Sequence, residues 1–195
     1  MALVKAQVER ILVKPKRLSR TVIYENPWVN LYVDKVQFPG GRIIERHHIL
    51  EFEKEAVAVL VENTQSQVLL VHAYRYTTNS IEWEVPAGIV EPGEPIIEAA
   101  KREVREESGY ETEDHKLVYT FYPMNGISNQ VFHIVHSRVT GGTGVFDQNE
   151  VKEFKWVSKP EIQRMIEDRL VQDGFTLTAL LLHLILSSNQ WSAVI

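Results

Sequence analysis

The segment from Gly88 to Tyr110, GIVEPGEPIIEAAKREVREESGY, limits the fold and function of this chain more than any other stretch. Its second half has the composition of a helix and carries Glu103, Glu106 and Glu107. Positions i, i+3 and i+4 share one face of an α-helix, so these carboxylates crowd a single surface. Like charges at this spacing repel each other and destabilise a helix. A hard divalent cation with oxygen ligands is a natural way to offset that repulsion.

Residues around the glutamates predict a helix that packs on a sheet. Ile97, Ala100 and Val104 form an apolar stripe at helical spacing. Gly109 follows at the place where a helix C-cap needs a residue able to adopt positive φ. Arg102 can pair with a neighbouring glutamate and hold it in place. An ordinary charged surface helix would explain neither the glycines at their distances nor three carboxylates on one face.

The spacing follows a known pattern. Gly88, five residues, Glu94, seven residues and then REVREESGY resembles the Nudix box, G-x5-E-x7-R-E-U-x-E-E-x-G-U, in which U is bulky and apolar. Every specified position matches, and Tyr110 is a slightly unusual residue at the last one. The resemblance implies an α/β fold, the Nudix α/β/α sandwich with a mixed sheet, and the order of the expected elements agrees with it.

The same resemblance implies a metal site. In the Nudix family the glutamates at these positions bind Mg²⁺ or Mn²⁺, and a backbone carbonyl of the opening turn, from Ala87 or Gly88, adds a ligand. Glu94 usually supports the site. The implied ligands are Ala87, Glu103, Glu106 and Glu107.

Composition argues against several classes of protein. With 195 residues, one domain is the default, and an apolar fraction of 44% is enough for a core. The net charge of −5 argues against nonspecific binding to nucleic acid through a basic surface. The chain has no cysteine, which removes disulfides, thiol catalysis and zinc–thiolate sites and fits a reducing compartment.

The sequence contains no signal for association with a membrane. Its first residues lack the continuous apolar segment of a signal peptide. The longest uninterrupted apolar run, Ala56–Val61, is far too short to span a bilayer. We therefore expect a soluble, cytoplasmic protein with neither a membrane nor a nucleic-acid partner.

The N-terminal part of the chain predicts β structure. Residues 1–20 are mixed and basic and predict a short strand or arm. Residues 21–50 predict an antiparallel pair, because Thr21–Tyr24 and Trp28–Phe38 are rich in β-branched and aromatic residues and Arg42–Leu50 returns after a Pro-Gly-Gly turn.

We place a domain boundary after residue 50, between an N-terminal β unit, 1–50, and a Nudix domain, 51–195. Such a unit precedes the core of ADP-ribose and nucleotide-sugar pyrophosphatases of the family, where it helps to build a dimer. The resemblance therefore implies a homodimer.

Beyond residue 50, the sequence predicts strands, the box helix and two further helices. A glycine-containing loop, Thr140–Asn149, is expected before the last strand. The expected strands are Ala56–Glu62, Gln67–Tyr76, Glu82–Pro86, Lys116–Tyr122, Gln130–Val139 and Glu153–Val157, and the expected later helices are 159–170 and Thr176–Leu186.

Two residues before the box are implied as substrate contacts. The run EWEVPAG, Glu82–Gly88, is similar to one in ADP-ribose and ADP-sugar pyrophosphatases, and Glu84 matches its acidic residue. Arg75 matches an arginine that contacts the substrate phosphates in those enzymes. A guanidinium binds phosphate bidentately, so the residue type suits the role. The alternative is a strand-end arginine that extends into solvent.

Two residues of the N-terminal unit are implied as contacts of the substrate base. In some ADP-sugar pyrophosphatases this unit supplies aromatic residues that stack on the base, and Trp28 matches the first of them. The second falls at Arg46, and arginine can also stack on a ring. The alternative, that Trp28 only packs within the β unit, is equally open.

Glu150 follows the glycine-containing loop and is the first candidate for the catalytic base. Its context resembles an acidic loop whose glutamate orients or deprotonates the attacking water, or completes the metal shell. The glycines would let the loop close on the substrate. Asp147 and Glu153 are nearby alternatives, and Glu106 is the alternative base on the helix. The histidines are interpreted as structural or exposed.

The sequence therefore predicts Mg²⁺-dependent hydrolysis of the pyrophosphate bond of ADP-ribose or a related nucleoside diphosphate sugar, giving a nucleoside monophosphate and a sugar phosphate. One departure leaves other sugar nucleotides open, because Asn125 replaces the proline of the subfamily run S-P-G-x-S-x-E. The alternatives are GDP-mannose or dinucleoside polyphosphate hydrolysis, and a non-catalytic nucleotide-sugar sensor. Such sensors usually lose box glutamates, whereas this box is complete.

Overall fold

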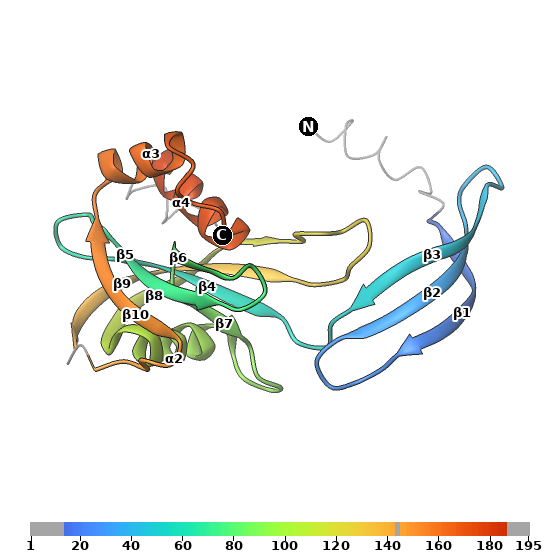
Figure 1. Cartoon of the computed structure of the whole chain (residues 1–195), viewed down its shortest axis with the longest axis horizontal. Coiled ribbons are helices and arrows are strands. Elements are labelled where there is room, and N and C mark those ends of the chain that lie inside the picture. Colours follow the sequence, from blue (N-terminus) through green and yellow to red (C-terminus); the bar gives the residue numbers. More distant parts are fainter. Residues whose placement is uncertain (1–13, 143–144, 187–195) are drawn as a thin grey trace, which may run out of the picture. The chain divides into compact units, whose positions relative to one another are not determined.

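The computed structural model describes residues 14–142 and 145–186, and the chain divides into two compact units (Figure 1). One unit extends to Glu53 and also takes in Met124–Asn129. The other comprises Lys54–Pro123 and the chain from Gln130 onward. A short segment from the middle of the sequence therefore belongs with the N-terminal strands.

The first unit contains an antiparallel sheet with the strand order β1-β2-β3. Its strands are β1 (Lys16–Tyr24), β2 (Asn30–Gln37) and β3 (Ile43–Glu51). The expected antiparallel β unit is confirmed, but it has three strands instead of a pair. Strand β1 joins the expected β segment Thr21–Tyr24 to part of residues 1–20, for which a short strand or arm is expected. Cross-strand ion pairs hold it, because Arg20 donates to Asp34 on β2 at 2.8 Å and to Glu51 on β3 at 3.0 Å.

The segment Met124–Asn129 is fixed to the end of β3. The Leu50 N–H donates to the Ile127 carbonyl at 2.8 Å. The side chain of Asn129 accepts the Phe52 N–H at 2.8 Å and donates to the Phe52 carbonyl at 3.0 Å. An amide side chain that satisfies both backbone groups of one residue mimics a sheet contact.

The second unit is built on a mixed sheet with the strand order β10-β5-β4-β9-β8. Strand β6 pairs with β5, and β7 pairs with β4. The β4–β9 pair is parallel and the other pairs are antiparallel. The strands are β4 (Ala56–Glu62), β5 (Val68–Arg75), β6 (Ser80–Glu84), β7 (Ala87–Ile89), β8 (Tyr110–Phe121), β9 (Phe132–Gly142) and β10 (Val151–Val157).

Helices cover both faces of this sheet, with α2 (Ile96–Ser108) on one and α3 (Lys159–Glu167) and α4 (Gly174–Ile185) on the other (Figure 1). Strand β4 explains the layering, because successive side chains point to opposite faces. Val57, Val59 and Val61 pack with α2, whereas Ala58 and Leu60 pack with α3 and α4. The predicted α/β/α sandwich is confirmed. No helix within the described ranges is both long and apolar enough to cross a membrane.

Several element boundaries differ from those expected. Strand β8 begins at Tyr110, six residues early, because Tyr110 pairs with Gly142 at the far end of β9. Strand β10 begins at Val151 and not at Glu153, and strand β9 extends to Gly142, inside the expected loop Thr140–Asn149. The short strand β7 was not expected. Pairing with a distant strand decides each of these limits, and local composition does not report it.

Candidate active site

The box helix α2 buries part of its acidic face. Gly109 ends the helix with φ 69° and donates its N–H to the Arg105 carbonyl at 2.9 Å, as the C-cap prediction requires. Glu103 is only 8% exposed and Glu107 only 6%, whereas Glu106 is exposed. The helix therefore turns two of its three box carboxylates inward.

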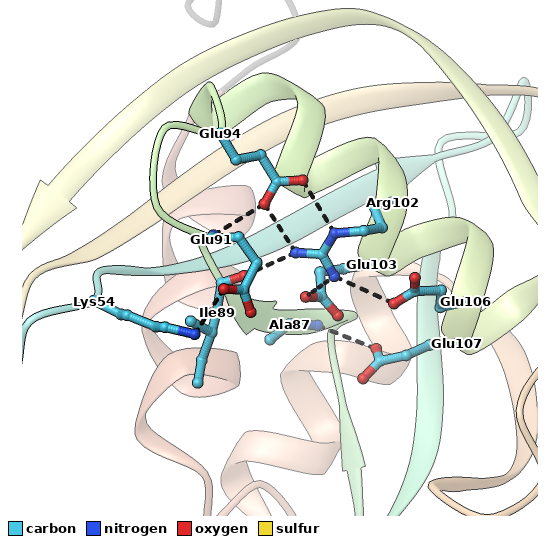
Figure 2. A network of polar contacts seen from close by, with 9 residues as sticks. All are labelled: Lys54, Ala87, Ile89, Glu91, Glu94, Arg102, Glu103, Glu106 and Glu107. Carbon is cyan, nitrogen blue, oxygen red and sulfur yellow. Dashed lines mark hydrogen bonds and ion pairs between the residues drawn. The ribbon is translucent and has the colours of Figure 1, made fainter. Parts of the chain in front are cut away.

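Arg102 joins the box glutamates to the turn before the helix (Figure 2). Its Nε and Nη2 atoms each donate to the Glu94 carboxylate at 3.0 Å. Its Nη1 atom donates to Glu103 at 2.7 Å and to Glu106 at 3.2 Å, and Nη2 also reaches the Ile89 carbonyl at 2.8 Å. The Arg102 guanidinium holds the pKa of Glu94 below its usual range. Arg102 is thus the central cation of the network.

Glu107 lies where a negative charge is disfavoured. Burial, followed by the nearby charge of Glu103, raises the pKa of Glu107 to about 8, although Glu107 accepts the Ala87 N–H at 3.1 Å. Burial also raises the pKa of Glu103, against the opposing effect of Arg102. Glu150 adds to both shifts, so its carboxylate lies within electrostatic range of these two glutamates.

Gly88, the first glycine of the box, leaves space for Glu103. A Cβ atom at position 88 would overlap the carboxylate of Glu103. The backbone at Gly88 is not in the left-handed region, so close approach, and not φ, requires glycine here. Any side chain at position 88 would displace the Glu103 carboxylate.

The donor set fits a hard divalent cation. Within residues 14–142 and 145–186, no three His, Asp or Glu side chains form a ready-made metal cluster, and Arg102 and the Ala87 N–H engage the box carboxylates. Glu103 and Glu107 are nevertheless candidate carboxylate ligands, and burial, followed by the repulsion of Glu103, raises the pKa of Glu107. A cation bound by these carboxylates would offset that repulsion.

Arg75 and Glu84 lie together in a pocket beside the box. Arg75 donates through Nε to Glu84 at 2.8 Å, and its Nη2 atom also contacts this buried carboxylate. The nearby charge of Glu107 contributes to the raised pKa of Arg75, after the larger effect of Glu84. The pocket has a volume of about 310 Å³, and the box glutamates are not among its lining residues. It is lined by Arg75, Thr77, Thr78, Ser80, Glu82, Glu84, Gln172, Asp173 and Gly174.

The start of α4 supports the strand that leads into the box. Asp173 caps α4 by accepting the Thr176 N–H at 2.7 Å. The Thr176 hydroxyl accepts the Val85 N–H at 3.1 Å, and both residues are buried. Only the fold shows that Thr176 fixes the backbone between Glu84 and Ala87, because the two segments are far apart in the sequence.

Glu150 lies in a turn that is anchored on both sides. Its carbonyl accepts the Tyr74 N–H from β5 at 3.1 Å. Of the alternatives to Glu150, Glu153 lies within 3.2 Å of the His72 ring instead. The structure therefore brings Glu150, Glu103 and Glu107 into one electrostatic neighbourhood.

Trp28 and Arg46 belong to the N-terminal unit. Trp28 is 65% exposed and follows a turn in which Asn26 accepts the Trp28 N–H at 2.6 Å. Arg46 is exposed on β3. Contact of either residue with a substrate base stays a prediction.

Comparison with known proteins agrees with this geometry. Residues 53–179, more than half of the chain, match the model described as NUDIX domain. The chain belongs to the Nudix family. Residues 15–50 match a second model, described as nucleoside diphosphate sugar hydrolase N-terminal domain. This Nudix protein is therefore a pyrophosphohydrolase, and enzymes of the family generally need a divalent metal.

Curated relatives of this Nudix chain differ in their stated activities. The chain is 27% identical to an ADP-ribose pyrophosphatase of Bacillus subtilis, over 85% of this chain and 90% of the relative. It is 26% identical to a CMP-5'-(N-acetyl-N-hydroxy-3-aminopropyl)phosphonate hydrolase of Streptomyces rubellomurinus, over 78% and 74%. It is 27% identical to a methanol dehydrogenase activator of Bacillus methanolicus, over 86% and 91%.

A solved structure, described as an ADP compounds hydrolase, shares the fold. It superposes with a TM-score of 0.74 and 20% identity, over 87% of this chain and 91% of that one. At this identity the likeness supports the α/β/α architecture and the N-terminal sheet.

Proposed function

We propose that this Nudix protein hydrolyses the pyrophosphate bond of ADP-ribose or a related nucleoside diphosphate sugar, with Mg²⁺ as its metal. The observation that carries the proposal is the pair of buried carboxylates, Glu103 and Glu107, which both lie within electrostatic range of Glu150, while Glu107 also lies within range of Arg75. An anionic diphosphate would be repelled by these acids alone. Mg²⁺ bound by the glutamates and the Ala87 carbonyl would neutralise it and polarise phosphorus.

The residues of the chain have separate roles in the proposed reaction. Arg75 holds a phosphate oxygen, and Glu84 orients the guanidinium. Glu150 takes a proton from water as the water oxygen bonds to one phosphorus and the bridging P–O bond breaks. The products are a nucleoside monophosphate and a sugar phosphate. Trp28 and Arg46 would stack on the base of the substrate. The protein would act as a homodimer. The absence of cysteine fits a cytoplasmic setting.

The names of two relatives support a substrate in which a nucleotide is linked to a second group, since one names ADP-ribose and the other a CMP-linked phosphonate. The relative named as a methanol dehydrogenase activator supports a binding or regulatory function as the alternative. Complete box glutamates favour catalysis over binding alone.

A substrate panel tests the proposal. ADP-ribose, ADP-glucose, GDP-mannose, UDP-glucose and a dinucleoside tetraphosphate are incubated with the protein and a phosphatase, in Mg²⁺ and in chelator. We expect phosphate release from ADP-ribose or another nucleoside diphosphate sugar only with the metal. Equal release in chelator, or release from the dinucleoside compound alone, would refute the proposal.

Two variants separate the candidate bases. We expect Glu150→Gln to lower kcat about 10²–10⁴-fold with little change in substrate binding, because a water-activating group acts mainly in the transition state. Glu106→Gln should instead weaken the binding of Mg²⁺ as well, so that more Mg²⁺ is needed for half-maximal activity. Full kcat in Glu150→Gln, with loss at saturating metal in Glu106→Gln, would assign the base to Glu106.

A further inference from the structure

The turn that carries Glu150 is bonded directly to the box helix. The Asp147 N–H donates to the backbone carbonyl of Glu106 at 2.9 Å. Glu106 lies in the last turn of α2, where helix carbonyls have no partner within the helix. The bond to Asp147 supplies such a partner, so the start of the turn is set by the helix that carries the box.

The Asp147 side chain closes the turn. One carboxylate oxygen accepts both the N–H and the side-chain N–H of Asn149, each at 2.8 Å. The Asp147 carbonyl accepts the Val151 N–H at 3.1 Å and the Glu150 N–H at 3.4 Å. An aspartate that bonds the backbone two residues on fixes the chain in a local turn. Glu150 is therefore the last residue of a closed turn, directly before buried Val151.

An aromatic contact holds the residue before this turn. Phe146 packs edge-on against Phe154 of β10, with ring centroids 5.5 Å apart. Phe154 packs in the same manner against Tyr110, the last residue of the box, at 5.4 Å. A row of aromatic contacts therefore joins the box to the turn. Packing against Phe154 explains why an aromatic residue, Tyr110, stands at the last position of the box.

We infer that the Asp147 side chain is a positioning group for Glu150: by accepting from Asn149 it closes the turn that the backbone bond from residue 147 to the Glu106 carbonyl ties to the box helix. The inference rests on the proposed function, since it assumes that Glu150 acts on the attacking water. It differs from the expectation that glycines deliver Glu150 by loop closure, which stays a prediction, because it starts from the bonds that tie Asp147–Glu150 to α2 at one end and to β5 at the other.

Steady-state kinetics of three variants test the inference on the substrate selected by the panel. We expect Asp147→Ala to lower kcat about 10–100-fold with KM and Mg²⁺ dependence changed less than about twofold, because a misplaced base weakens only the transition state. Asp147→Asn keeps an oxygen that can accept from Asn149, so it should restore kcat to within about twofold of wild type. Asp168→Ala, at the exposed end of α3, is the matched control and should leave kcat unchanged.

A double variant shows whether Asp147 acts through Glu150. In a Glu150→Gln background, Asp147→Ala should cause no further loss of kcat, because residues that act as a unit are not additive. A further loss of the same size would overturn the inference. Hydrogen exchange should show faster exchange of the 147–150 amides in Asp147→Ala than in Asp147→Asn.

The two proposals fail in different ways. If Glu150→Gln is impaired while Asp147→Ala keeps full kcat, the positioning role is wrong and the proposed function stands. If Glu150→Gln keeps full kcat, the base assignment is wrong and the positioning role falls with it. Unchanged exchange of the 147–150 amides in Asp147→Ala would overturn the inference whatever the substrate.

Discussion

The two faces of the central sheet share strand β4, but the helices on them bury different kinds of side chain. On one face α2 buries two carboxylates, Glu103 and Glu107, beside Val104 and two alanines. On the other face α4 buries no carboxylate: Ala179 and Leu180 join the apolar cluster, beside the buried polar side chains of Thr176 and His183. A buried carboxylate is unfavourable unless it is paired, whereas a buried leucine stabilises the fold through the hydrophobic effect. The carboxylates that α2 buries therefore lower the stability of the fold but are available for chemistry. The apolar side chains that α4 buries raise the stability of the fold.

The largest effect that would test this contrast is expected from Glu107→Gln. The amide oxygen of glutamine can still accept the Ala87 N–H, so the fold should be kept. Loss of a charged ligand should lower turnover of the selected nucleotide sugar by at least about 10³-fold. The measurement is the Mg²⁺ dependence of kcat, with circular dichroism as the control for folding. Near wild-type turnover in this variant would remove Glu107 from the site.

On the opposite face, Leu180→Ala should lower stability and leave turnover nearly unchanged. Leu180 is fully buried, so its truncation should lower the free energy of unfolding by about 2–5 kcal/mol. Turnover per folded molecule, measured well below the melting temperature, should stay within about twofold of wild type. Urea denaturation and kinetics on the same sample measure both quantities. A large fall in kcat of the folded variant would mean that the two faces are not independent.

The smallest effect is the pH dependence of stability in chelator. The pKa of Glu107 is about 8 in the fold, against 4.5 in the reference state, so the folded protein binds the extra proton and stability falls as pH rises through this interval. His183 acts in the opposite direction at lower pH, because burial lowers its pKa from 6.5 to about 4. Between about pH 6.5 and 8, the Glu107 contribution should lower the free energy of unfolding by about 2 kcal/mol, or roughly 4–8 °C in Tm.

Glu107→Gln is the matched control for this slope. The variant cannot titrate at position 107, so its stability in chelator should change less over the same pH interval than that of wild type. Saturating Mg²⁺ should also reduce the wild-type slope, because a cation favours the ionised carboxylate. Parallel slopes for wild type and variant would contradict the assignment of the raised pKa to Glu107.

The features predicted correctly depend on residues close together in sequence. The box helix and its Gly109 cap follow from spacing within a few turns, and the buried strand β4 follows from one apolar run. These patterns decided the fold class, because an amphipathic helix and a strand buried on both faces need covering layers.

The features that the sequence did not reveal depend on partners far along the chain. His133, interpreted only as structural or exposed, is buried between the Thr120 hydroxyl at 2.9 Å and Glu55 at 2.8 Å. The bond from Asp147 to the Glu106 carbonyl likewise joins residues in separate elements. No periodicity or composition reports such a pair, because each partner alone is an ordinary polar residue.

The parallel pairing of β4 with β9 has a consequence for how the chain reaches its fold. Parallel strands need a crossover connection, and here the connection from Glu62 to Phe132 contains β5 to β8 and the whole of α2. Closing so long a loop is entropically unfavourable until the contacts it permits have formed, so this pairing should make refolding slow. The helix that carries the box lies inside the crossover itself, so its docking on the sheet and the closure of the sheet should belong to one cooperative event.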